Sequence, residues 1–81
     1  IQRANDTQYG LGAGVFTSSI ALADYFVSRL HAGTVWVNTY LSGDVGIPFG
    51  GYKASGYGRE GGEEGLLPYL ETKTVVTNIE L

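Results

Sequence analysis

The chain has 81 residues, 13 glycines, no cysteine, one histidine and a formal net charge of −3. This length suits one small domain at most, and the apolar core of so short a chain is marginal. Because neither a disulfide nor a cysteine–histidine metal site can support that core, we expect the chain to need further protein around it. Charges of mixed sign without a basic face argue against nucleic acid as a partner. No apolar run approaches the roughly 20 residues that a membrane-spanning helix requires, so no membrane partner is expected either.

The opening residues, Ile1 to Asn5, contain no initiator methionine and no pattern typical of a secretory signal. They look like the end of a helix, which favours a sequence cut from a longer protein; tag removal or processing is the alternative. Since no targeting signal is visible in this piece, a cytoplasmic location is the default expectation.

A strand, a helix and a second strand are expected in the first half of the chain. Residues 4–10 have the composition of a turn, and residues 13–17 that of a short strand. Ser18 or Ser19 can cap the helix, and Gly33 can end it. Residues 34–38 are β-branched and aromatic, as in a strand covered on both faces. The simplest connection is a right-handed crossover between parallel strands, so the predicted fold class is α/β. The helical positions with the spacing of one buried face are Ile20, Ala23, Phe26, Val27 and Leu30.

The second half is expected to hold a long Gly-rich loop and a terminal strand. The loop covers residues 40–62, and its aromatic residues favour a functional segment over a disordered one. Residues 60–67 fit a short helix that Pro68 ends or kinks. Residues 74–81 alternate between apolar and polar side chains, which is typical of a strand. We therefore divide the chain into residues 1–73 and a terminal strand, residues 74–81.

Catalytic residue types are scarce. Covalent catalysis needs a nucleophile with a base in reach, and the only conventional base, His31, is better explained as a polar residue at a helix end. Glu60, Glu63 and Glu64 are interpreted as solvated acids at a helix start. Residues 56–61 satisfy the dinucleotide pattern G-x-G-x-x-G, but no strand directly precedes them and no full helix is expected after them. We therefore predict no cofactor-binding residue in this chain.

Three motifs carry a resemblance to a known family. They are residues 9–17 (YGLGAGVFT), residues 33–38 (GTVWVN) and residues 48–60 (PFGGYKASGYGRE). In this order and spacing they resemble the C-terminal signature of the NAD(P)-dependent aldehyde dehydrogenase superfamily, from about Arg3 to Val76. The resemblance implies that residues 1–73 are the C-terminal portion of a parallel-sheet catalytic domain and that residues 74–81 are an oligomerisation strand.

In that superfamily a cysteine thiolate attacks an aldehyde, NAD(P)+ accepts a hydride, and water hydrolyses the thioester to a carboxylic acid. This chain has no cysteine, and the family's general base and nucleotide-binding segments lie upstream of the matching part. The resemblance therefore implies that NAD or NADP is bound mainly outside this chain, that its partners are the remainder of the enzyme and a small aldehyde, and that residues 1–81 alone are inactive. The alternative is a non-enzymatic interaction module that keeps the fold for oligomer assembly.

The resemblance also implies roles for single residues around the substrate. Phe49 matches an aromatic residue of the substrate tunnel, and Leu41 and Gly43 fall where family members vary their pocket. Ordinary packing beneath a Gly-rich turn is the alternative for Phe49. Because Gly43 has no side chain, we expect a roomier pocket for a bulky or extended aldehyde.

Further positions match cation and interface residues of the family. Lys53 and Gly56 match positions that in some members hold a monovalent cation such as potassium through backbone carbonyls, and Glu60 matches a carboxylate of a buried charge relay. A purely conformational role for this backbone is the favoured alternative. Arg59 and Glu71 are the expected internal ion pair, as members tie this segment together across the subunit boundary with residues at matching positions. Further contacts with the neighbouring subunit of a dimer or tetramer are expected from Val75, Thr77 and Ile79.

Overall fold

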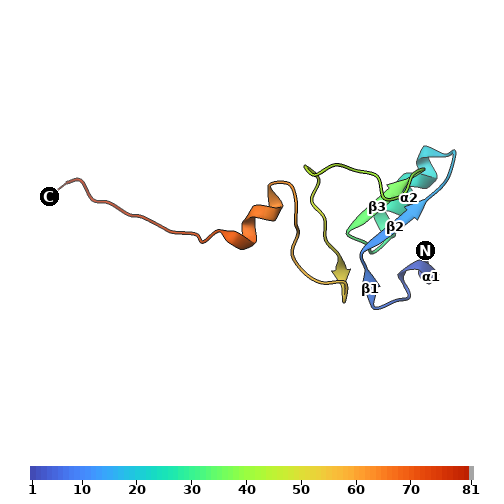
Figure 1. Ribbon diagram of the computed structural model, residues 1–81, viewed down its shortest axis with the longest axis horizontal. Helices are drawn as coiled ribbons and strands as arrows, with labels where there is room; N and C mark the ends of the chain where they lie inside the picture. Colours follow the sequence, from blue (N-terminus) through green and yellow to red (C-terminus); the bar gives the residue numbers. More distant parts are fainter. Residues whose placement is uncertain (81) are drawn as a thin grey trace.

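The structure is a computed structural model that describes residues 1–80. A folded body gives way to a long tail that runs away from it (Figure 1). The radius of gyration is 18.4 Å and the extents are 67 × 26 × 21 Å, whereas a compact domain of this length has a radius of gyration of about 12 Å. The chain is therefore far from spherical. No helix among residues 1–80 is long and apolar enough to cross a membrane.

The body is centred on strand β2 (Gly12–Val15), helix α2 (Ile20–Arg29) and strand β3 (Thr34–Val37). The two strands pair in parallel, with Gly12 opposite Thr34 and Val15 opposite Val37. The expected strand, helix and strand are present, close to the predicted bounds. Ser19 is the residue that caps α2, because its Oγ accepts a hydrogen bond from the Leu22 N–H at 3.2 Å.

Helix α2 ends before Gly33, so the prediction that this glycine stops the helix is wrong. The last helical residue is Arg29, and Leu30 after it is extended. A methyl group on Gly33 would overlap the carbonyl oxygen of Gly50. Glycine is therefore needed at position 33 for the close approach of two backbone segments.

The core of the body is small. Its buried apolar side chains are Val15, Ala23 and Leu30, and none of the described side chains is fully buried. The predicted burial of two helical positions is wrong for this chain, since Ile20 is 80% exposed and Val27 is 42% exposed. Helix α2 has only a two-stranded sheet to pack against, which leaves part of its apolar surface uncovered. Apolar exposure of this extent is typical of a segment that packs against more protein.

A second strand pair lies beside the first, and the sequence patterns do not predict it. Strand β1 (Tyr9–Gly10) pairs antiparallel with strand β4 (Tyr52–Lys53). The turn predicted at residues 4–10 is therefore confined to residues 6–8, between helix α1 (Gln2–Asn5) and β1. The predicted loop at residues 40–62 contains β4 and a bridge between Phe49 and Glu60, so it folds back onto the body.

The helix expected at residues 60–67 is displaced towards the C-terminus. Glu60 is bridged to Phe49, and the helical segment is the 3-10 helix η1 (Glu64–Tyr69). Pro68 lies inside η1 and does not end it. The N–H of Leu70 bonds to the carbonyl of Leu67 at 3.2 Å, so the last turn closes across the proline.

The tail, residues 70–80, is extended and exposed along its whole length (Figure 1). It forms no ladder with the rest of residues 1–80. The side chains of Val75 and Ile79 are 74% and 89% exposed. Leu81, the last residue of the predicted strand, lies outside the described residues. A strand at residues 74–81 stays a prediction, because its pairing requires another surface.

Candidate functional site

The three residues expected at the substrate tunnel lie around one hollow. Leu41, Gly43 and Phe49 line a cavity of about 570 Å³ between β3 and the segment that follows it. A cavity of this size with mostly apolar walls suits the carbon skeleton of a small ligand. The other lining residues are Thr34, Val35, Trp36, Ser42, Asp44, Val45, Ile47 and Pro48.

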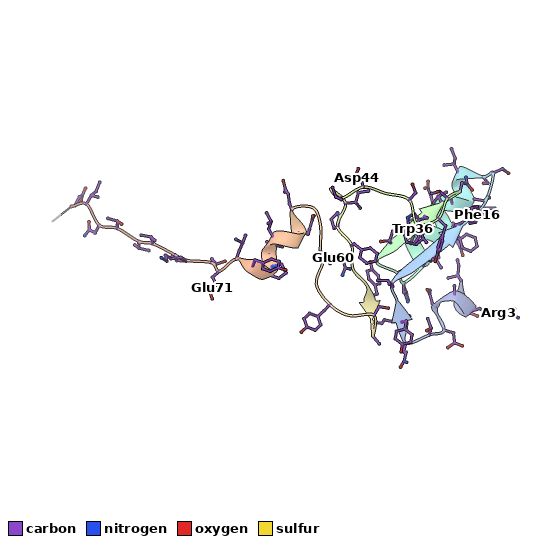
Figure 2. The ribbon with its side chains drawn as sticks, in the orientation of Figure 1. Arg3, Phe16, Trp36, Asp44, Glu60 and Glu71 are labelled. Atoms are coloured by element: carbon purple, nitrogen blue, oxygen red, sulfur yellow. The ribbon has the colours of Figure 1, made fainter. Side chains whose placement is uncertain are left out.

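Trp36 anchors one side of this hollow. Its indole Nε1 donates a hydrogen bond to the carbonyl of Ser42 at 2.7 Å. Its ring packs edge to face against Tyr40, with centroids 4.8 Å apart. The ring also covers Gly12, where a Cβ atom would approach Trp36 Cζ3 to 2.7 Å. Trp36 therefore links β2, β3 and the start of the loop (Figure 2).

Leu41 projects from the loop that Trp36 holds. Its φ is 58°, a conformation that residues with side chains seldom adopt, and its side chain is 76% exposed. Gly43, two residues later, has space around it, since a Cβ atom there would meet only Ile47 Cδ1, at 3.5 Å. The loop thus presents one exposed apolar side chain and one gap towards the hollow.

Phe49 is held by backbone bonds to Glu60. The Phe49 N–H donates to the Glu60 carbonyl at 2.7 Å, and the Glu60 N–H donates back at 2.8 Å. The Phe49 side chain is 40% exposed. Glu60 is exposed in this chain (Figure 2), so a buried charge relay through its carboxylate requires surfaces beyond residues 1–80.

Lys53, the last residue of β4, and Gly56 lie at the two ends of the turn that follows this strand. The Lys53 carbonyl accepts a hydrogen bond from the Gly56 N–H at 3.3 Å, and the φ angles of the two residues are 54° and 121°. Among residues 1–80, no three His, Cys, Asp or Glu side chains gather as metal ligands. A cation at this turn would therefore depend on backbone carbonyls.

The structure does not bring Arg59 and Glu71 together. Arg59 Nη1 donates to the carbonyls of Gly51 at 3.1 Å and Gly58 at 2.7 Å. Glu71 lies on the tail beyond η1, away from the body (Figure 2). No ion pair joins them within the described part of the chain, and a pair formed across a subunit boundary stays a prediction.

Several wall residues are not predicted from the sequence. Trp36, Val45 and Ile47 line the same hollow as Leu41 and Phe49. The available signal was the presence of large apolar side chains in and beside a Gly-rich loop, where an ordinary solvated loop would carry polar ones.

The chain matches the model of the aldehyde dehydrogenase family over residues 1–75. It is 57% identical over 75 residues to mitochondrial 10-formyltetrahydrofolate dehydrogenase of Homo sapiens, which covers 93% of this chain and 8% of that protein. It is 57% identical over 79 residues to aldehyde dehydrogenase, cytosolic 1, of Rattus norvegicus; the match covers 98% of this chain and 16% of that protein. A third relative, the mitochondrial benzaldehyde dehydrogenase of Antirrhinum majus, is 52% identical over 80 residues; the match covers 99% of this chain and 15% of that protein.

Solved structures agree with this match. An aldehyde dehydrogenase from Bacillus cereus in complex with NAD+ has a TM-score of 0.93 and 48% identity, covering 98% of this chain and 16% of that one. A betaine aldehyde dehydrogenase double mutant from Staphylococcus aureus, also with NAD+, has a TM-score of 0.95 and 46% identity, covering 100% and 16%. The chain spans only 8% to 16% of the length of the relatives named above. The family match, the identities and the structural agreement together show that the chain belongs to the aldehyde dehydrogenase family.

Proposed function

We propose that this chain is the C-terminal piece of an NAD(P)-dependent aldehyde dehydrogenase that oxidises an aldehyde to a carboxylic acid. The oxidation passes through a thioester on a cysteine that lies in another part of the enzyme, because this chain has no cysteine. NAD(P)+, bound mainly by other segments, takes the hydride. One observation supports the role of this piece above all others: Leu41, Gly43 and Phe49 line a single hollow.

The hollow serves as part of the substrate-tunnel wall. Apolar side chains such as Phe49 contact the carbon skeleton of the aldehyde and keep bulk water away from the reactive thioester. Gly43 leaves free space, because a side chain there would meet only the end of Ile47. We therefore propose that the enzyme accepts bulky or extended aldehydes.

The tail supplies subunit contacts in the proposed dimer or tetramer. Its apolar side chains Val75, Val76 and Ile79 are 74%, 91% and 89% exposed, and it forms no strand ladder within residues 1–80. An alternating segment of this kind can add a strand to a neighbouring sheet. The same tail would also serve the alternative function, a non-enzymatic module that assembles oligomers.

We also propose that the backbone carbonyls of Lys53 and Gly56 take part in binding a monovalent cation such as potassium. The support is the tight turn at these residues, with Gly56 at a φ that favours glycine. Crystals of the full-length enzyme grown with potassium should show density beside both carbonyls. Crystals that show none there would rule the site out.

An assay of the full-length protein tests the proposed enzyme. We expect NADH or NADPH to form with aldehydes of increasing size. Phe49→Ala should raise the KM for bulky aldehydes about tenfold, because the wall loses its largest side chain, and should affect small aldehydes less. Phe16→Ala is a matched control, since Phe16 is also exposed, at 71%, but lies outside the hollow.

The outcomes separate the two functions. If the full-length protein oxidises no aldehyde with NAD+ or NADP+, the enzyme proposal fails and the assembly module stands. Residues 1–81 alone should form no NADH, because they lack the nucleophile. Any turnover by the isolated chain would contradict the view that catalysis depends on other segments.

A further inference from the structure

The C-terminal end of α2 has no glycine cap. Leu30 is extended there, so the neighbouring peptide groups need other hydrogen-bond partners. Asn5 provides two of them: its Nδ2 donates to the Arg29 carbonyl at 2.8 Å, and its Oδ1 accepts from the His31 N–H at 2.8 Å. The side-chain amide of Asn5 thus acts as a surrogate peptide group that ties α1 to the end of α2.

The backbone carbonyl of Asn5 is engaged as well. It accepts hydrogen bonds from the Thr7 N–H at 2.9 Å and from Lys53 Nζ at 3.1 Å. Lys53 Nζ also donates to the Thr7 carbonyl at 3.0 Å. Bonds from an ammonium group are stronger than those between neutral groups. One lysine therefore holds the segment from Asn5 to Thr7 against β4.

Two further bonds close the same contact. The Ala54 N–H donates to the Gln8 carbonyl at 2.8 Å, and the Gly10 N–H donates to Ser55 Oγ at 2.9 Å. Lys53 itself has a φ of 54°, a costly conformation that persists only where surrounding bonds hold it. The Lys53 ammonium is the charged group among these bonds, and its two bonds to the Asn5 and Thr7 carbonyls support this geometry of β4.

Strand β4 leads directly back to the substrate wall. Phe49 lies three residues before Tyr52, the first residue of β4, and the intervening Gly50 and Gly51 have no room for a side chain. Because only these two closely packed residues separate Phe49 from β4, we expect a shift of β4 relative to α2 to displace Phe49. Neither Asn5 nor Lys53 lines the hollow itself.

We infer that the Asn5 amide and the Lys53 ammonium form one positioning clamp, which fixes β4, and with it Phe49, relative to the end of α2. The inference rests on the proposed function of Phe49 in the aldehyde wall. Asn5 and Lys53 are positioning residues, which affect the substrate through Phe49. The clamp uses the Lys53 side chain, so it is independent of any cation bound by the Lys53 carbonyl.

Lys53→Met in the full-length enzyme tests the clamp, because methionine keeps an unbranched chain and the backbone carbonyl but removes the ammonium donors. Hydrogen exchange at the Gly10 and Ala54 amides should accelerate about tenfold, since local opening becomes easier. The amides between β2 and β3 should keep their protection. The KM for bulky aldehydes should rise about tenfold, with a much smaller change for small ones.

Companion variants sharpen the test. Asn5→Ala should change amide exchange and KM in the same direction. The double variant with Lys53→Met should differ little from either single variant, because each substitution alone already disrupts the same clamp. Lys53→Arg keeps a cationic donor and should restore most of the KM ratio between bulky and small aldehydes. Arg3→Met is the matched control. It removes an exposed cation from α1, the helix that contains Asn5, and should behave as wild type.

Two outcomes would overturn the clamp. One is unchanged amide exchange in Lys53→Met. The other is a general loss of stability in which the KM ratio between bulky and small aldehydes stays constant. If the wild-type enzyme oxidises no aldehyde, the proposed function fails, while the amide exchange of Lys53→Met still decides whether the clamp exists.

Discussion

The indole Nε1 of Trp36 donates a hydrogen bond to the carbonyl oxygen of Ser42 at 2.7 Å. A side chain on β3 therefore holds the backbone of the loop from which Leu41 projects with a φ of 58°. The shape of the hollow depends on this bond as well as on the apolar side chains around it.

Trp36→Phe removes that bond together with the part of the indole ring whose Cζ3 atom lies over Gly12. We expect the free energy of unfolding to fall by at least about 1 kcal/mol, the usual contribution of such a hydrogen bond, because packing over Gly12 is lost as well. The midpoint of urea unfolding of the full-length protein measures this change. Tyr57→Phe, which alters a side chain that is 103% exposed, is the control. Equal midpoints for the two variants would contradict the role of the indole N–H.

Two glycine variants of the same chemistry should differ in stability. A methyl group on Gly33 would overlap the Gly50 carbonyl, whereas one on Gly43 would make an ordinary contact with Ile47 Cδ1 at 3.5 Å. Gly33→Ala should therefore lower the free energy of unfolding by about 1–3 kcal/mol, and Gly43→Ala should change it by less than about 0.5 kcal/mol. Thermal unfolding of both proteins checks this order, and the reverse order would show that the backbone approach at Gly33 is not tight.

Gly43→Phe should narrow the range of substrates. A ring at this position would occupy the hollow between Leu41 and Phe49, so the KM for long or aromatic aldehydes should rise about tenfold while that for acetaldehyde changes little. Steady-state kinetics with a size series measures the effect. A wild-type enzyme that already prefers acetaldehyde strongly over larger aldehydes would show that the free space at Gly43 has no role in specificity.

Deletion of residues 75–81 from the full-length protein should dissociate the proposed dimer or tetramer, because it removes the exposed apolar segment that is expected to pair with the neighbouring subunit. Light scattering gives the mass directly. An oligomer of unchanged mass would mean that the subunit contacts are made elsewhere.

Glu71→Lys should loosen the oligomer and lower activity if Glu71 pairs with an arginine of the neighbouring subunit. Breaking a buried pair costs about 3–5 kcal/mol, whereas an exposed pair matters little. Glu63→Lys, which changes an exposed acid before η1, is the matched control. An unchanged assembly and rate in Glu71→Lys would remove this residue from the interface.

The elements with a clear period were predictable from the sequence. Helix α2 follows from its capping serine and its three-and-four spacing, and β3 from its β-branched and aromatic residues. Strands β1 and β4 have two residues each, too few to show any alternation, so the patterns missed them. The exposure of Ile20, at 80%, could not be predicted either, because the spacing of apolar residues does not show how much of a helix the neighbouring elements cover.

The site was only partly accessible to sequence reasoning. Leu41, Gly43 and Phe49 came from the family resemblance, and no local spacing would have joined them. The side-chain hydrogen bonds of Asn5 connect it to residues that are 24 and 26 positions away, so from the sequence alone Asn5 resembles an ordinary turn former. Contacts of this kind follow from how distant segments meet, which the periodicity of a sequence does not record.

The close approach of Gly33 to Gly50 also limits which amino-acid substitutions this protein can accept during evolution. Backbone atoms fill the space at Gly33 and Gly50, and Ser55 Cβ fills it at Gly51, whereas Gly43 is open and Leu41 is largely uncovered. Substitutions at Leu41 and Gly43 in the loop should therefore leave the strands undisturbed. If the loop has the proposed role in the substrate wall, we expect substitutions that alter substrate choice to be accepted at Leu41 and Gly43 and not at Gly33 or Gly50.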